Sequence, residues 1–206
     1  MNLPNSLTLT RIFLVPLLVV VLLTKFEGRH IFGVPKELVG AAIFALASLT
    51  DWADGYLARR RKQITPLGQL IDPLADKLLT SAAFISLVQM DLAPAWMVAV
   101  IIGREFAVTG LRSLGYARGV AIPASPLGKI KMIAQVVAIL ALILAHGGAQ
   151  GGMFTFYVIG QTALWVVVGA ALVSAADYFR RFNLVLSPRV ADISIAREQR
   201  SDRKVG

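Results

Sequence analysis

Apolar residues fill six stretches of the sequence, and each stretch approaches the roughly 20 residues with which a helix crosses a bilayer. Glycine and proline, which favour turns, separate these stretches. These helix-breaking residues are Gly28, Pro35, Pro66, Pro94 and Pro123, together with the glycines of the segment 147–152. The pattern predicts six helices. They cover residues 4–24, 37–61, 67–90, 94–117, 125–146 and 153–177.

The composition favours a single membrane domain. Hydrophobic residues make up 56% of the chain, and the mean hydropathy is +0.69. We therefore predict an all-α integral membrane protein with six transmembrane helices over residues 1–178. Residues 179–206 form a polar, basic cytoplasmic tail, which we expect to be surface-lying or disordered. The apolar run after Arg11 lacks a signal-peptide cleavage site, so we expect it to be retained.

The chain has a net charge of +9, and the distribution of its basic residues predicts how it is oriented in the membrane. The sequence is too apolar for a typical nucleic-acid binder, so the basic residues are expected to meet membrane lipids or anionic substrates. One set of connections, with the tail, carries most of the lysine and arginine, whereas the opposite connections carry only Lys25, Arg29 and Lys36. The positive-inside tendency predicts that both termini are cytoplasmic, in the cell (inner) membrane.

Four acids interrupt the second and third apolar stretches: Asp51, Asp54, Asp72 and Asp76. Carboxylates at membrane depth are costly and usually functional. Helical residues three or four apart share a face, so each pair forms a stripe, and the turn before Pro66 folds the two stripes together near the cytoplasmic surface. Small residues accompany the acids and leave room for a ligand. They are Gly55, Ala58 and Gly68.

Converging carboxylates would repel one another unless cations lie among them. Two divalent ions would neutralise them and leave positions open for phosphate oxygens. The chain has no cysteine and only two histidines, so the expected metal is hard and oxygen-bound, Mg²⁺ or Mn²⁺. An alternative is that the four acids form buried ion pairs. Only Arg59 and Lys77 are available as partners, so part of the negative charge of the carboxylates would stay uncompensated. A cation transporter would also use membrane carboxylates, but it has no need of the small residues.

The pattern D-x2-D-G-x2-A-R-x8-G-x3-D-x3-D, filled from Asp51 to Asp76, resembles the signature of the CDP-alcohol phosphatidyltransferase family. The resemblance implies a six-helix membrane fold, usually a homodimer, in which an alcohol attacks the β-phosphorus of a CDP-linked lipid and CMP leaves. It also implies that Asp51, Asp54 and Asp72 are metal ligands. Asp76 would contact the metals and act as general base. The implied CDP-binding residues are Gly55, Ala58, Arg59 and Gly68.

The N-terminal pattern P-N-x2-T-x2-R also resembles the family, in which this region approaches the CDP moiety. It places Asn5, Thr8 and Arg11 roughly in line at the start of a helix. The resemblance implies that Asn5 and Thr8 bind CDP. The alternative is an interfacial helix anchored by Arg11.

The acceptor is suggested by R-E-x5-L-R from Arg104 and by A-S-x2-G-K-x-K up to Lys131. Both resemble the phosphatidylglycerophosphate synthase branch, although Met132 stands where threonine is common. The resemblance implies glycerol 3-phosphate as acceptor, and arginine forks suit its phosphate. The predicted phosphate-binding residues are Arg112, Arg118, Lys129 and Lys131. Ordinary positive-inside charge is the alternative for each of them.

Several alternatives stay open from the sequence. Arg104 and Glu105 are expected to pair with each other or to organise the pocket. The same chemistry could use inositol phosphate or serine in place of glycerol 3-phosphate. The rival from another class is a cation transporter, and a purely structural subunit would carry the cost of uncompensated acids. In the leading hypothesis the partners are CDP-diacylglycerol, glycerol 3-phosphate, membrane lipids and a second copy of the chain.

Overall fold

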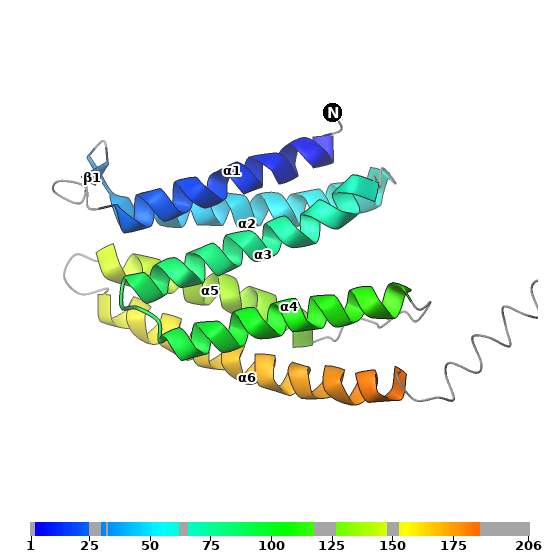
Figure 1. Cartoon of the computed structure of the whole chain (residues 1–206). Helices are drawn as coiled ribbons and strands as arrows, with labels where there is room; N and C mark the ends of the chain where they lie inside the picture. Colours follow the sequence, from blue (N-terminus) through cyan, green and yellow to red (C-terminus); the bar gives the residue numbers. More distant parts are fainter. Residues whose placement is uncertain are drawn as a thin grey trace, which may run out of the picture.

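The computed structural model of the 206-residue chain describes residues 3–24, 30–31, 33–61, 66–117, 127–147 and 153–185. Within these residues the chain forms six helices and one short antiparallel hairpin (Figure 1). The helices are α1 (Leu3–Leu23), α2 (Lys36–Arg61), α3 (Pro66–Gln89), α4 (Ala95–Ala117), α5 (Leu127–Gly147) and α6 (Met153–Val185). The hairpin pairs β1 (His30–Ile31) with β2 (Val34–Pro35).

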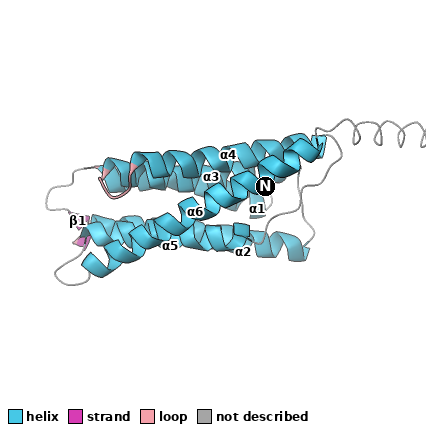
Figure 2. Cartoon of the chain, turned by 90° about the horizontal axis from the view of Figure 1, so that it is seen from below, coloured by secondary structure: helices cyan, strands magenta, loops and turns pink. Residues whose placement is uncertain are grey.

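The six helices lie roughly along one axis and form a bundle (Figures 1 and 2). α1 packs against α2 and α3, α5 packs against α2 and α6, and α4 lies against α6. Successive helices run in opposite directions. The first residues of α1, the end of α2, the start of α3, the end of α4 and the last residues of α6 therefore lie at one end of the bundle, and α5 begins toward the same end (Figure 1). The predicted aspartate stripes and the predicted acceptor residues accordingly share an end.

Every helix contributes apolar side chains to one continuous core. Phe44 of α2, Phe84 of α3 and Leu142 of α5 are completely buried, and they pack with Leu18 of α1 and Leu164 of α6. Between lipid-embedded helices, close van der Waals packing of such side chains supplies much of the attraction, because lipid is as apolar as the core.

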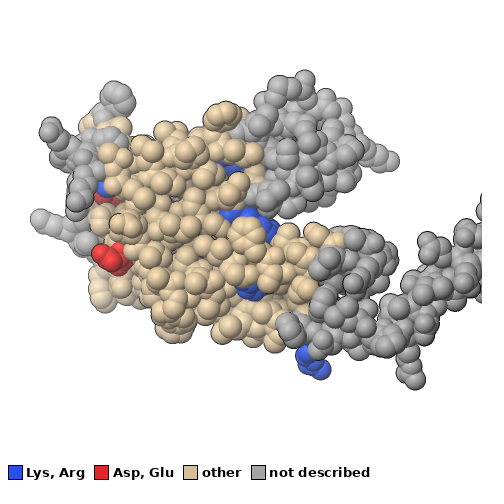
Figure 3. All heavy atoms as spheres, in the orientation of Figure 1, with Lys and Arg blue, Asp and Glu red and all other residues tan. Residues whose placement is uncertain are grey.

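The outer face of the bundle is also apolar. Large hydrophobic side chains on each of the six helices are exposed, including Phe13 (74%), Leu46 (62%) and Phe154 (78%). Figure 3 shows one face, whose described part is mostly uncharged, with a few basic side chains near its middle and acidic ones at the left edge. Monomeric soluble proteins rarely expose such broad apolar surfaces, whereas lipid-facing helices do so routinely.

Two helical segments within the described residues are long and apolar enough to cross a membrane, as judged from length and composition: Ile130–Gly147 and Phe154–Tyr178. Two shorter apolar segments, Thr10–Leu23 and Lys77–Gln89, belong to α1 and α3. The all-helical bundle is thus confirmed, and six membrane crossings with both termini in the cytoplasm stay a prediction.

Helix ends are closed by specific contacts. α3 ends in a turn in which Asp91 has a positive φ of 58° and the amide of Leu92 donates to the carbonyl of Leu87 at 2.9 Å. The side-chain amide of Gln161 in α6 donates to the backbone carbonyl of Leu92 at 2.7 Å, so this hydrogen bond connects the turn to the last helix. These bonds satisfy carbonyl groups that a helix end would otherwise leave unpaired.

The six helices agree with the sequence-based expectation, with two differences. The hairpin at residues 30–35 was not expected, because strands of two residues leave no periodic pattern. The expectation that the last helix ends near residue 177 is wrong, since α6 continues to Val185 into the stretch assigned to the tail. No glycine or proline lies between Gly169 and Pro188, so nothing in the sequence interrupts that helix.

Candidate active site

The four aspartates lie on two neighbouring, oppositely directed helices. Asp51 and Asp54 are in the second half of α2, and Asp72 and Asp76 are in the first half of α3. The connection over residues 62–65 is short, so the backbone brings both stretches to the same end of the bundle (Figure 1). Their side chains lie outside the described residues. The prediction that four carboxylates converge is consistent with this placement and stays a prediction.

The residues predicted to bind the nucleotide lie on the same two helices as the aspartates. Gly55, Ala58 and Arg59 are within α2, and Gly68 is within the first turn of α3. Their helical backbone is described, and their side chains and surroundings lie outside the described part of the structure. Their proximity to the aspartates along both helices is what the sequence pattern requires.

The start of α1 lies at the same end of the bundle (Figure 1). Asn5 and Thr8 are in its first turns, with side chains beyond the described set. The next polar residue on that face, Arg11, is only 2% exposed. A buried guanidinium does not reach lipid headgroups, so this burial weighs against an interfacial helix anchored by Arg11.

A polar cluster joins α4, α5 and α6. Glu105 forms ion pairs with Arg104, at 3.6 Å, and with Lys131 of α5. The Nε of Arg104 donates to the Ser174 hydroxyl of α6 at 2.8 Å. The expectation that Arg104 and Glu105 pair with each other is confirmed. Lys131 is 3% exposed, and Glu105 partly neutralises it in this apolar setting.

A second contact of the same helices involves Arg112 and Tyr178. The Nη2 of Arg112 donates to the phenol oxygen of Tyr178 at 2.7 Å, and its guanidinium carbon lies 5.6 Å from the ring centroid. The guanidinium carbon of Arg104 lies 5.9 Å from the same centroid. Tyr178, which is 4% exposed, therefore lies within reach of two cations.

The structure describes the side chains of two of the four residues predicted to bind the acceptor phosphate. Lys131 is paired with Glu105, and Arg112 donates to Tyr178. Lys129 is in the first turn of α5 with its side chain outside the described residues, and Arg118 lies outside them entirely. All four assignments stay predictions.

Ser174 and Tyr178 were missed by the sequence analysis. Both are buried polar residues on the same face of α6, four positions apart. Their partners on α4 are 70 and 66 residues away in the sequence. The available signal was the spacing of four between these two hydroxyl-bearing residues in a largely apolar helix, since buried polar groups usually have a specific partner.

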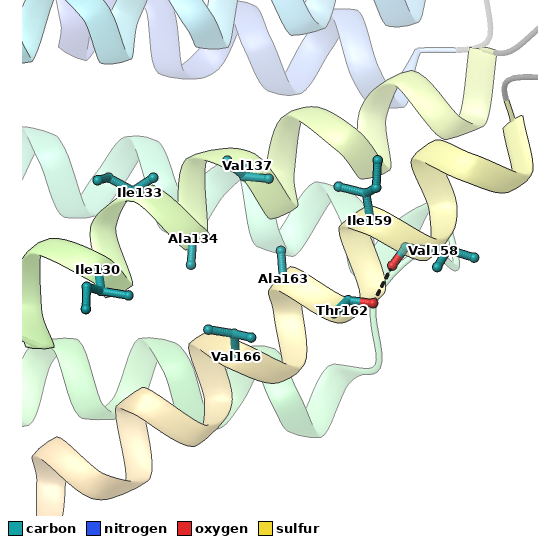
Figure 4. Close-up of a pocket in the computed structure, with 9 residues that line it drawn as sticks. All are labelled: Ile130, Ile133, Ala134, Val137, Val158, Ile159, Thr162, Ala163 and Val166. Atoms are coloured by element: carbon teal, nitrogen blue, oxygen red, sulfur yellow. Dashed lines mark hydrogen bonds between the residues drawn. The ribbon is translucent and has the colours of Figure 1, made fainter.

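An apolar groove of about 510 Å³ runs between α5 and α6 on the surface of the bundle. Its lining is aliphatic apart from Thr162, whose hydroxyl donates to the carbonyl of Val158 at 2.7 Å (Figure 4). No side chain in this lining could bind a charged group. The groove fits hydrocarbon by the chemistry of its lining.

The residues proposed to hold a metal suit a hard divalent cation by their chemistry. Asp51, Asp54 and Asp72, with Asp76, offer only carboxylate oxygens, which Mg²⁺ and Mn²⁺ prefer. Among the side chains that the structure describes, no group of three or more histidine, aspartate or glutamate residues could hold a metal. The aspartates are outside that set. They are four acids at helical spacings on two adjacent helices, so they are the natural candidates.

A sequence profile of the CDP-alcohol phosphatidyltransferase family matches residues 1–177. The chain belongs to this family. A CDP-diacylglycerol–glycerol-3-phosphate 3-phosphatidyltransferase of Bacillus subtilis (strain 168) is 49% identical over 185 residues, which cover 87% of this chain and 94% of the relative. A protein of the same name from Rickettsia felis is 35% identical over 179 residues, with shares of 87% and 94%.

A probable phosphatidylglycerophosphate synthase of Mycobacterium tuberculosis (strain H37Rv) is 39% identical over 175 residues, covering 85% of this chain and 81% of the relative. The family match spans all six helices up to the last third of α6. It therefore includes both aspartate stripes, Arg104, Glu105, Arg112 and Lys131.

Proposed function

We infer that this protein transfers a phosphatidyl group from CDP-diacylglycerol to glycerol 3-phosphate, giving phosphatidylglycerophosphate and CMP. The observation that carries the inference is the 49% identity, over most of both chains, to a Bacillus subtilis protein named for this reaction. Its family membership and the described polar cluster near the acceptor motifs agree with it. The protein is a membrane-associated helical enzyme.

The residues proposed to carry out the reaction belong to α2 and α3. Asp76 would take the proton from the primary hydroxyl of glycerol 3-phosphate, whose oxygen then bonds to the β-phosphorus of CDP-diacylglycerol. The bond between that phosphorus and the bridging oxygen breaks, and CMP leaves with the electron pair. Asp51, Asp54 and Asp72, with Asp76, would hold two divalent ions. Bound there, Mg²⁺ or Mn²⁺ would neutralise the charge on the diphosphate.

The remaining residues would position the two substrates. Gly55 and Ala58 would let the diphosphate approach the backbone of α2, and Arg59 would pair with a phosphate oxygen. Asn5 and Thr8 would contact the CDP moiety from α1. Phosphoryl-type transfer needs mainly positioning and electrostatic stabilisation, which fits a site built from acids, small residues and a few cations.

The acceptor phosphate would lie among the basic residues at the end of α4 and the start of α5, namely Arg112, Arg118, Lys129 and Lys131. The partial burial of Arg112 and its neutral partner Tyr178 support a role in binding an anion. Inositol phosphate would satisfy the same cations, and serine would not. The identity with glycerol-3-phosphate enzymes favours glycerol 3-phosphate over both.

We also propose six membrane crossings with both termini and the site at the cytoplasmic face, and a homodimer. The biased distribution of lysine and arginine supports this orientation. The exposed apolar side chains on all six helices support full insertion. The homodimer is supported by the family resemblance of the sequence alone.

An acceptor panel tests the function. Purified protein is incubated with CDP-diacylglycerol, Mg²⁺ and one of glycerol 3-phosphate, inositol phosphate, serine or glycerol, and CMP release is measured. We expect CMP with glycerol 3-phosphate and much less with the others. CMP release with serine or inositol phosphate alone would overturn the proposed acceptor. Cation flux into sealed vesicles without CDP-diacylglycerol would instead support a transporter.

A further inference from the structure

Tyr178 links the two arginines of α4 to α6. Arg104, Val108 and Arg112 are spaced by four residues and form one stripe of α4, and Val108 packs against the Tyr178 ring. Both guanidinium carbons lie within 6 Å of that ring, at 5.9 and 5.6 Å. Because Tyr178 is 4% exposed and comes from a separate helix, its position is determined by packing and not by the arginines alone.

The two arginines differ in their counter-charge. Arg104 has Glu105 at 3.6 Å and the Ser174 hydroxyl at 2.8 Å, and Ser174 in turn donates to the carbonyl of Ala171. Arg112 has only the neutral Tyr178 as hydrogen-bond partner among the described residues, and no described carboxylate lies within ion-pair distance of it. The one described acid of the cluster, Glu105, is shared between Arg104 and Lys131.

Arg112 also has unused hydrogen-bonding capacity. Its Nε is buried and has no hydrogen-bond partner in the structure. A buried N–H of a charged group without a partner is costly, and a guanidinium has five N–H groups in a fixed fork. With Nη2 committed to Tyr178, the rotation of the fork is restricted, and its remaining donors have a defined direction. This is the arrangement that two-point binding of a phosphate requires.

We propose that Tyr178 is a positioning residue for the acceptor: it holds the guanidinium of Arg112 so that the free N–H groups bind the phosphate of glycerol 3-phosphate. The proposal rests on the proposed function. It assigns to α6, which carries none of the predicted site residues, a part in selecting a phosphorylated acceptor. Tyr178 acts through Arg112 and does not take part in the bond-making step.

A double-mutant cycle tests the proposal, with Tyr178→Phe, Arg112→Gln and the double variant. Tyr178→Phe keeps the ring and removes the hydrogen-bonding oxygen. We expect it to raise the KM for glycerol 3-phosphate roughly ten-fold, as loss of a hydrogen bond to a charged group implies. The KM for CDP-diacylglycerol and kcat should change less than two-fold. In the Arg112→Gln background the same change should add almost nothing, because the two residues act as a unit.

The matched control is Tyr157→Phe, which removes the same oxygen from an exposed tyrosine at the other end of α6. It should leave both KM values unchanged. The proposal is overturned if Tyr178→Phe leaves the KM for glycerol 3-phosphate unchanged, or if the two substitutions are additive. A parallel rise of both KM values with a lowered Tm would also overturn it, because that pattern indicates a structural role.

Direct binding separates this proposal from the proposed function. Isothermal titration with inorganic phosphate compares the wild-type protein with Tyr178→Phe without any turnover. If the wild-type protein releases no CMP with glycerol 3-phosphate, the proposed function fails. Weaker phosphate binding by Tyr178→Phe would then still support the positioning role. Equal binding by the two proteins would overturn it.

Discussion

Gly160 of α6 lies against Leu142 of α5 with no room for a side chain. A methyl group placed on the Cα of Gly160 would stand 2.6 Å from the Cγ of Leu142 and 3.1 Å from its backbone nitrogen. The α5–α6 pair is the most closely associated in the bundle, and small residues let helices approach in this way. Rotation of the Leu142 side chain would move its Cγ, but the contact with the backbone nitrogen would remain and would require the two helices to shift.

Gly160→Ala should therefore destabilise the bundle. We expect a loss of about 1–3 kcal/mol, the usual cost of overpacking a close contact, measured as a lower midpoint of thermal unfolding in detergent. The control is Gly169→Ala on the same helix, where nothing lies within 4 Å of the added methyl group. That variant should be neutral or slightly more stable, because alanine favours helices over glycine. Equal midpoints for Gly160→Ala and the wild-type protein would contradict the packing argument.

Lys36 closes the end of α1 from the first turn of α2. Its Nζ donates to the carbonyls of Leu22, at 3.0 Å, and Thr24, at 3.2 Å, and the residue is 7% exposed. Lys36→Met would leave these carbonyls unpaired and should lower stability by about 1.5–3 kcal/mol. Chemical denaturation in mixed micelles measures the change. Arg180→Met, at an exposed position of α6, serves as control and should stay within about 0.5 kcal/mol of the wild-type protein.

Asp76→Asn should abolish most of the turnover while the protein still binds its lipid substrate. The amide cannot accept the proton of the acceptor hydroxyl, so CMP release should fall at least about 100-fold. Equilibrium binding of CDP-diacylglycerol should be retained in part. Asp91→Asn is the control, because Asp91 lies in the α3–α4 turn with a φ of 58°, a conformation that asparagine tolerates. Full activity of Asp76→Asn would exclude it as the general base.

Removal of divalent cations should stop the reaction. Four carboxylates cannot bind a nucleotide diphosphate without intervening positive charge, so EDTA should reduce CMP release to background. Addition of Mg²⁺ or Mn²⁺ in excess should restore it, whereas Na⁺ at equal ionic strength should not. Turnover that persists after exhaustive treatment with EDTA would rule out the metal-dependent chemistry proposed for Asp51, Asp54 and Asp72.

Periodicity and breakers along the chain were sufficient for the helices but not for their exact ends. α2 and α3 begin within one residue of their expected starts because proline is favoured in or just before the first turn of a helix and disfavours helix in the residue before it. The expected end of α6 near residue 177 is too early, because hydropathy falls after Tyr178 although the helix continues to Val185. A helix can leave the apolar layer and continue, since its backbone hydrogen bonds do not depend on the hydropathy of its side chains.

The sequence by itself determined the family, the six helices and the two aspartate stripes, because these follow from local spacing: 3.6 residues per turn and fixed offsets between neighbouring side chains. The tertiary structure alone decided which cations of α4 and α5 have counter-charges, and that Ser174 and Tyr178 of α6 are their partners. The physical reason is distance along the chain. Contacts between residues 66 or 70 positions apart arise from helix packing, which no local pattern encodes.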